Sequence, residues 1–342
     1  MIQSSKRRLA GLFWAAVAIA IWSGSLVLTR FGVTTTLTVY DLTALRFAVA
    51  AVLLAPLAPA GSFDLVRRRP LTVLVMIVGF GAPYVLMISL ALKTAPASVA
   101  GTLNPGIMAA VSVGLGRAFF GDRVGGVRLA GLALVAAGVA VLVGFAGQFG
   151  VGEIILLATG GMWAVYAFTV RKFGVPALTA TALVAIGSAV FYLPVYLLAL
   201  PSRIATAPLP DLALQAGFQG VLVSALAVYA FTRSAELLGP TASAALPSLI
   251  PVTTLGLGLA FLGEDAGMVR LASAGLIGAG VAAILVGRRN RAVPMPEDAQ
   301  NGRACETIAT PSSINRSISS SPRPASASTS LVCSPSSGPP CR

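Results

Sequence analysis

The chain has 342 residues and a net charge of +13; 56% of its residues are hydrophobic and only 10% are charged. Soluble globular domains carry about 25% charged residues, so this composition excludes a water-soluble fold and indicates a protein with many membrane spans. Histidine is absent and the three cysteines all lie in the last 40 residues, which excludes imidazole catalysis and thiolate metal sites from the apolar body.

Ten apolar stretches predict ten transmembrane helices, because each is close to the ~20 residues that a helix needs to cross the hydrocarbon. They cover residues 9–29, 38–58, 71–92, 97–118, 127–146, 152–170, 178–200, 212–232, 240–261 and 269–287. Alternation of the kind found in membrane barrels is missing, so we predict an all-α membrane protein. The first stretch follows Lys6, Arg7 and Arg8 as a signal peptide would, but its length favours a retained helix.

The cations between these stretches fall mainly on one side of the membrane. With the N-terminus inside, only Arg30, Lys93, Arg203 and Arg270 lie outside, and Arg46 lies within a span. This bias predicts a multi-pass protein of the inner or plasma membrane with both termini cytoplasmic. We interpret the cations as orientation signals and expect the bilayer and a small molecule as partners, but no nucleic acid. A homodimer is compatible with the sequence, although no surface argues for one.

The last segment, residues 290–342, is rich in Ser, Pro and Ala. It cannot bury enough apolar surface to fold, so we expect a disordered tail. A non-functional extension, including a reading-frame artefact, is the favoured interpretation. A regulatory or interaction tail is the alternative.

The chain contains an internal repeat. Residues 105–140 and 247–282 are identical at 17 of 36 positions without a gap. The likeness reaches the start of each half, where Gly11, Trp22 and Arg30 correspond to Gly152, Trp163 and Arg171. We therefore predict two five-helix repeats, 9–146 and 152–287. An odd number of helices in each makes the second repeat inverted in the membrane.

The charges at equivalent loops agree with this inversion. Gly121-Asp122-Arg123 in the first repeat becomes Gly263-Glu264-Asp265 in the second. The first loop is predicted inside and is basic, whereas its equivalent is predicted outside and has lost the cation, as the positive-inside rule requires.

Short motifs in both halves resemble the drug/metabolite transporter superfamily, EamA type. They are Trp22-Ser23-Gly24, Arg46, Ala97-Ser98, Asn104-Pro105, Gly121-Asp122, Gly131 and Gly138 in the first half, and Trp163-Ala164, Ala242-Ser243, Pro247, Pro251, Gly263-Glu264 and Gly280-Val281 in the second. The resemblance implies two inverted five-helix repeats around a central substrate cavity, and transport of small metabolites or drugs, often export. Asp122 departs from the family, which usually has Glu there.

Polar and aromatic side chains within the spans are candidates for substrate binding, because polar groups in a bilayer are costly. The candidates are Trp22, Ser25, Arg46, Tyr84, Asn104, Trp163, Tyr166 and Tyr229. Arg46 is the sole charge between Leu42 and Leu57. It could clamp a carboxylate or phosphate of a substrate, or extend to the headgroups.

The other candidates also have two interpretations. The tryptophans could stack on an aromatic or cationic ligand or simply pack between helices. Ser25 is expected to bond its own helix backbone rather than substrate. Tyr84 follows a segment that Gly79, Gly81 and Pro83 loosen, and broken helices often border transporter sites.

Residues outside this set have simpler expected roles. Asp41 is expected to cap a helix, and Gln215 and Gln219 to face the cavity or to join two helices. The glycines at 114, 116, 256 and 258, and the pair Gly275 and Ala279, are expected at close helix contacts.

The function predicted is secondary transport by alternating access, exporting a small metabolite or drug. We expect no enzyme activity, cofactor or metal, because the chain has eleven scattered acids and no histidine. An intramembrane lipid-modifying enzyme and a non-transporting membrane receptor or scaffold are the alternatives. The sequence leaves substrate, direction, coupling ion and oligomeric state undetermined.

Overall fold

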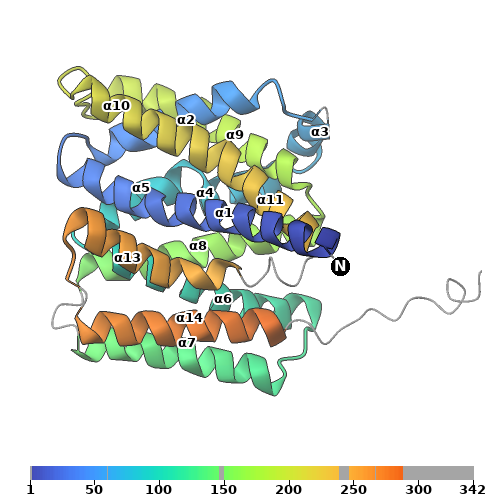
Figure 1. The fold of residues 1–342 in the computed structure, drawn as a ribbon. Coiled ribbons are helices and arrows are strands. Elements are labelled where there is room, and N and C mark those ends of the chain that lie inside the picture. Colours follow the sequence, from blue (N-terminus) through green and yellow to red (C-terminus); the bar gives the residue numbers. More distant parts are fainter. Residues whose placement is uncertain (1, 60, 146–149, 239–245, 266, 288–342) are drawn as a thin grey trace, which may run out of the picture. The chain divides into compact units, whose positions relative to one another are not determined.

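Helices form all the regular secondary structure of the part of the chain that the computed structural model describes, which is residues 2–59, 61–145, 150–238, 246–265 and 267–287. Figure 1 shows how they are arranged. The Ala242-Ser243 motif and the predicted tail at 290–342 lie outside the described residues.

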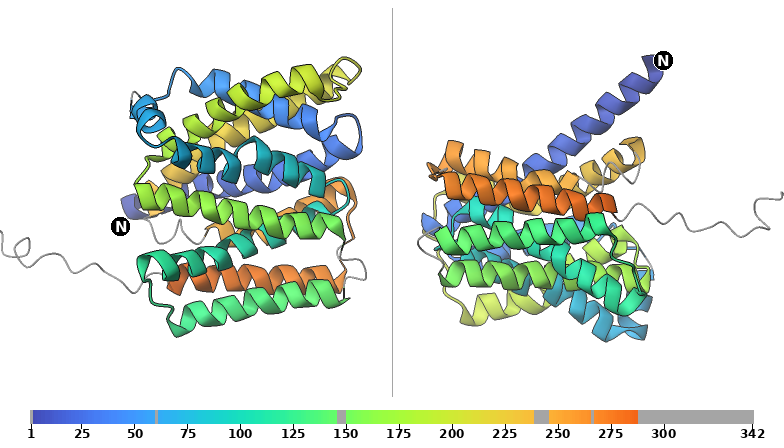
Figure 2. Two further views of the ribbon diagram at one scale, coloured as in Figure 1. Left: turned by 180° about the vertical axis from the view of Figure 1, so that it is seen from behind. Right: turned by 90° about the horizontal axis from the view of Figure 1, so that it is seen from below.

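The first repeat begins with the longest helix. Helix α1 has 33 residues and is about 50 Å long, so it exceeds the ~30 Å hydrocarbon layer. Its N-terminal end projects past the neighbouring helices in the right-hand view of Figure 2. The helices of this repeat are α1 (Ile2–Thr34), α2 (Val39–Leu54), α3 (Gly61–Arg68), α4 (Pro70–Phe80), α5 (Ala82–Ala91), α6 (Ala97–Phe120) and α7 (Gly126–Phe145).

The second repeat contains a stretch of π-helix, η1, in which the backbone hydrogen bonds run one residue wider than in an α-helix. Its elements are α8 (Val151–Phe173), α9 (Ala177–Ala199), α10 (Leu209–Gln215), η1 (Ala216–Leu226), α11 (Ala227–Leu238), the 3₁₀ turn η2 (Leu246–Leu249), α13 (Ile250–Leu262) and α14 (Met268–Val286).

Eight of the described helical segments are long and apolar enough to cross a membrane, which confirms the all-α membrane class. The predicted stretches 38–58 and 240–261 correspond to shorter helices, α2 with 16 residues and the segment Pro247–Leu262. Helix α2 is short for a local reason. It starts at a capping box between Thr38 and Asp41, and it ends just before Pro56, whose ring disfavours helix in the preceding residue. The expected role of Asp41 as a helix cap is confirmed.

The packing follows the repeat. Helix α7 runs along its equivalent α14, and α2 packs on its equivalent α9 (Figures 1 and 2). Helix α6 packs on α8 of the other repeat, and the equivalent of α6, α13, packs on α1, the equivalent of α8. Contacts exchanged in this way are what a pseudo-twofold axis between inverted repeats produces.

Close approach of α7 and α14 depends on Gly131 and Gly280. A Cβ atom on either would lie 2.7 Å from the carbonyl oxygen of the other, so neither position has room for a side chain. The expected close contacts are wrong at Gly114, Gly256 and Gly275, where a Cβ would meet no other described atom within 4 Å. Those three glycines lie on open faces, because small residues occur all along these helices and the sequence does not indicate which face meets a neighbour.

Candidate functional site

The third apolar stretch is broken at Gly81, as the glycines and proline around it predicted. Gly81 has φ −94° and ψ −145°, which ends α4 and starts α5. The freed amide of Ala82 donates to Ser188 Oγ of α9 at 3.0 Å. Gly79 lets α4 approach α8, because a Cβ there would lie 3.0 Å from the Met162 carbonyl oxygen. The break positions the turn that carries Tyr84 between α6 and α8.

A chain of hydrogen bonds joins three helices beside this break. The Tyr84 hydroxyl of α5 donates to Asn104 Oδ1 of α6 at 3.3 Å. Asn104 Nδ2 donates to Thr159 Oγ1 of α8 at 2.8 Å. All three side chains are buried, with exposed fractions of 7%, 2% and 0%. A buried polar chain of this kind is stable only when its members are paired, so it fixes the three side chains relative to one another.

Aromatic rings form a layer against this polar chain. Phe80, the last residue of α4, stacks on Trp163 and Tyr166 of α8, with ring centroids 5.6 and 4.9 Å apart. It also contacts Tyr84, with centroids 5.1 Å apart. Offset aromatic stacking of this kind gives a rigid apolar wall next to the hydrogen-bonding groups.

Arg46 is carried by α2, which packs on α5, the helix of Tyr84. Its guanidinium lies 5.9 Å from the ring centroid of Phe47. The side chain is partly exposed, and no described residue offers its guanidinium a carboxylate or a hydrogen-bond acceptor. A guanidinium in an apolar setting binds an anion strongly when one is present.

Trp22 and Ser25 belong to a second group, on α1. Trp22 packs on Phe231 of α11, with centroids 5.3 Å apart. The Ser25 hydroxyl donates to its own helix at the Trp22 carbonyl, 2.7 Å away, as expected from the sequence. Gln219 Nε2 donates to the Ser25 carbonyl at 3.0 Å and to Thr29 Oγ1 at 2.9 Å.

The glutamines therefore join helices, which was one of their two expected roles. Gln215 Nε2 donates to the Leu28 carbonyl of α1 at 2.7 Å, one turn along from the Gln219 contacts. Tyr229 lies apart from both groups: it is 55% exposed and packs edge-to-face on Trp14, with centroids 5.3 Å apart.

The structure thus brings Arg46, Tyr84, Asn104, Trp163 and Tyr166 together, whereas Trp22 and Ser25 lie in a second group and Tyr229 in a third. Two members of the first group, Phe80 and Thr159, were not predicted from the sequence. Thr159 is a hydroxyl residue in an otherwise apolar part of α8, and Phe80 directly precedes the break at Gly81; these were the available signals.

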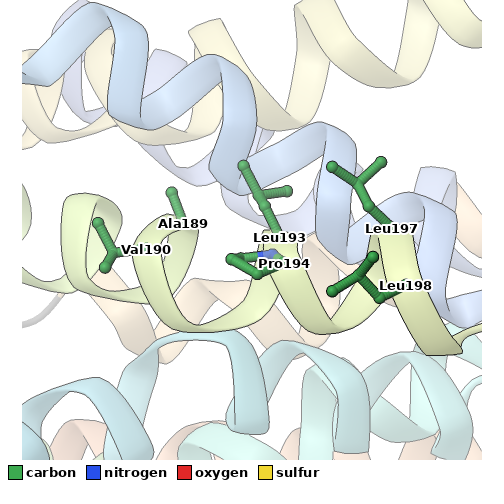
Figure 3. Close-up of a pocket in the computed structure, with 6 residues that line it drawn as sticks. All are labelled: Ala189, Val190, Leu193, Pro194, Leu197 and Leu198. Atoms are coloured by element: carbon green, nitrogen blue, oxygen red, sulfur yellow. The ribbon is translucent and has the colours of Figure 1, made fainter.

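An apolar groove lies elsewhere, along α9. Its six lining residues are Ala189, Val190, Leu193, Pro194, Leu197 and Leu198 (Figure 3). Leu198 is 87% exposed, and the lining is almost entirely apolar. This surface suits lipid tails and offers no polar group to orient a substrate. Within the described residues no three His, Cys, Asp or Glu side chains gather as metal ligands would.

Membrane-spanning helices in two inverted repeats, with a buried polar and aromatic group between them, define a multi-pass membrane protein of the transporter class. The model of the EamA-like transporter family matches the chain at residues 9–144 and again at 150–286, so the chain belongs to this family of the drug/metabolite transporter superfamily.

A solved structure described only as "Crystal structure of protein" has the same fold. It is 23% identical to this chain, covers 84% of it and 99% of its own length, and superposes with a TM-score of 0.56. At this identity the likeness supports the fold alone. No curated protein matches the chain.

Proposed function

We propose that this protein is a secondary transporter that exports a small metabolite or drug carrying an anionic group next to an apolar body. Its binding site is the group formed by Arg46, Tyr84, Asn104, Trp163 and Tyr166. The observation that carries the proposal is Arg46, whose guanidinium has no acceptor among the described residues. A carboxylate, phosphate or sulfonate of a substrate would supply one.

The neighbouring residues support the same chemistry. The Phe80 layer offers flat apolar surface to the body of the substrate. Asn104 accepts from the Tyr84 hydroxyl and donates to Thr159, so it fixes the Tyr84 ring next to the Phe80 layer that would contact the body of the substrate. Substrate binding at the interface between the repeats, next to a broken helix, is typical of secondary transporters.

Direction, orientation and location are part of the proposal. The excess of Lys and Arg on one side of the spans favours cytoplasmic termini in the inner or plasma membrane. We propose a transporter rather than an enzyme, working without cofactor or metal, whose partners are the bilayer and its substrate.

Counterflow in liposomes tests this function. The full chain is reconstituted with a panel of carboxylates, phosphate esters, amino acids, nucleosides, sugars and organic cations, each radiolabelled in turn. Saturable exchange of an anionic class is expected. Saturable binding without any exchange would contradict transport and support a receptor, and exchange of cations alone would contradict the anion site.

A further inference from the structure

Two ion pairs join the repeats, one at each end of α6. Arg30 Nε of α1 lies 3.2 Å from Glu264 Oε1, which follows α13. Arg171 of α8 lies 3.1 Å from Asp122 Oδ2, which follows α6. The first pair sits at Ala97, where α6 begins, and the second just past Phe120, where it ends. A helix of 24 residues is about 36 Å long, so the pairs lie on opposite sides of the hydrocarbon.

The four residues are two equivalent pairs. Arg30 corresponds to Arg171, and Glu264 corresponds to Asp122, in the repeat alignment. In each pair the acid comes from one repeat and the arginine from the other. The same contact is therefore built twice by symmetry, once at each end of the molecule.

The local geometry is duplicated as well. Each acid follows a glycine with φ +62°, at Gly121 and Gly263, which ends its helix. The amide of each acid donates 3.1 Å back to a glycine carbonyl, Asp122 to Gly116 and Glu264 to Gly258.

Those two glycines also leave room for the carboxylates. A Cβ at Gly116 would lie 2.9 Å from Asp122 Oδ2, and one at Gly258 would lie 2.8 Å from Glu264 Oε2. Both repeats keep these glycines because each carboxylate lies at the same place relative to the end of its helix.

The two ion pairs differ in how deeply they are buried and in how many other hydrogen bonds they make. Glu264 accepts from the Ala97 amide at 2.6 Å, and from the amide and hydroxyl of Ser98 at 3.0 and 2.6 Å. Its side chain is 6% exposed, against 18% for Asp122. Arg30 is 22% exposed and also donates to the Leu92 and Ala95 carbonyls, whereas Arg171 is 40% exposed and lies over the Phe120 ring.

We infer that these pairs are the two gates of the transport cycle: Arg30–Glu264 holds the repeats together at one end, Arg171–Asp122 at the other, and the two close in alternation. In this structure both pairs are formed, and the Glu264 pair is the more deeply buried of the two. Opening the Glu264 end requires its carboxylate to leave the start of α6, and opening the other end requires Arg171 to leave Asp122. This inference rests on the proposed function, since gates matter only if substrate passes.

Accessibility measurements test the gates without any substrate. In full-length protein with Cys305, Cys333 and Cys341 replaced by serine, Tyr166→Cys serves as a reporter within the proposed site. The rate of its reaction with a membrane-impermeant maleimide is measured separately from each side of oriented vesicles. Glu264→Gln and Asp122→Asn each remove one charge and leave the side-chain shape nearly unchanged. The matched control is Asp265→Asn, because Asp265 is the exposed loop residue next to Glu264.

We expect Glu264→Gln to raise the labelling rate from one side and Asp122→Asn to raise it from the other, each by about 5-fold or more, the usual size of a coupling between conformations. Asp265→Asn should change neither rate. Arg30→Gln combined with Glu264→Gln should add little to either single variant, as for residues that act as one pair.

Faster labelling from the same side in both variants, or no change in either, would overturn the inference. Because this readout needs no substrate, it is distinguishable from failure of the transport proposal. Gated labelling together with absent counterflow would sustain the gates and count against the proposed substrate site.

Discussion

Trp22 and Trp163 occupy the same position in the two repeats but different surroundings. Trp163 stacks on Phe80, which contacts Tyr84 and so borders the polar chain through Asn104. Trp22 packs on Phe231, next to glutamines that bond the backbone of its own helix. Duplication therefore reproduced the scaffold, whereas the polar chain and its aromatic layer lie beside Trp163 and not beside Trp22.

This contrast separates two kinds of residue. Those that both repeats keep, such as Arg30 and Arg171 or Gly121 and Gly263, do the same work at opposite ends of the molecule. Asn104, by contrast, is a leucine, Leu246, in the second repeat. Under the proposed function, the residues that only one repeat has are expected to distinguish a substrate, because a small asymmetric ligand needs an asymmetric site.

The largest effect is expected at Arg46. Arg46→Ala should weaken transport of an anionic substrate by about 10- to 100-fold, because a hydrogen bond to a charged group contributes about 1.5–3 kcal/mol. Counterflow rates at several substrate concentrations measure this change. Arg46→Lys is the control for charge and should retain part of the activity. Equal transport by all three proteins would remove Arg46 from the site.

Gly131 tests the scaffold rather than the site. Gly131→Ala places a methyl group against the Gly280 carbonyl and the Ile284 amide, and backbone atoms cannot move aside easily. We expect a loss of about 1–3 kcal/mol in the free energy of unfolding, measured as a lower melting temperature in detergent. Gly275→Ala on α14 has open space and is the matched control; a similar loss in both variants would contradict the packing described for α7 and α14.

Asn104→Leu copies the residue of the second repeat into the first. It leaves the Tyr84 hydroxyl without its acceptor, whereas Thr159 keeps its bond to the Leu156 carbonyl. The unpaired hydroxyl costs about 1–3 kcal/mol, so the KM for exchange should rise several-fold while the protein still folds. The control is Thr253→Val, since among the described residues that exposed hydroxyl bonds only the Leu249 carbonyl of its own turn. An unchanged KM would show that the polar chain does not position the substrate.

The smallest effect on KM is expected at the two tryptophans, which occupy equivalent positions and so compare the repeats directly. Trp163→Leu removes a stacking contact that contributes about 0.5–1.5 kcal/mol, so it should raise the KM a few-fold. Trp22→Leu should have a smaller effect on KM, since its ring packs on Phe231. Equal effects would mean that both repeats contribute alike to the site.

Much of the fold could be predicted from the sequence because it depends on local or periodic signals. Apolar length predicted the helices, Gly81 and Pro83 predicted the break, and the position of Asp41 predicted its cap. Contacts between distant helices were harder. Thr159 meets Asn104 across 55 positions, and that register is set by how α6 and α8 pack.

The same limitation explains the glycines. Gly114 and Gly131 look alike in the sequence, yet only Gly131 faces a neighbouring helix at close range. The repeat alignment already contained Arg30 and Asp122 with their equivalents, but it could not show that the acid of one repeat meets the arginine of the other. Only the three-dimensional arrangement supplies that pairing.

We expect Arg46 to form an anion site. The aromatic rings around it also attract cations, so a cationic substrate is the main alternative. Two probes that cross a bilayer poorly, phenylmethanesulfonate and phenyltrimethylammonium, present the same ring with opposite permanent charges. Counterflow of each by the reconstituted full chain decides between them. The account predicts saturable exchange of the sulfonate and none of the ammonium; exchange of the ammonium alone would contradict it.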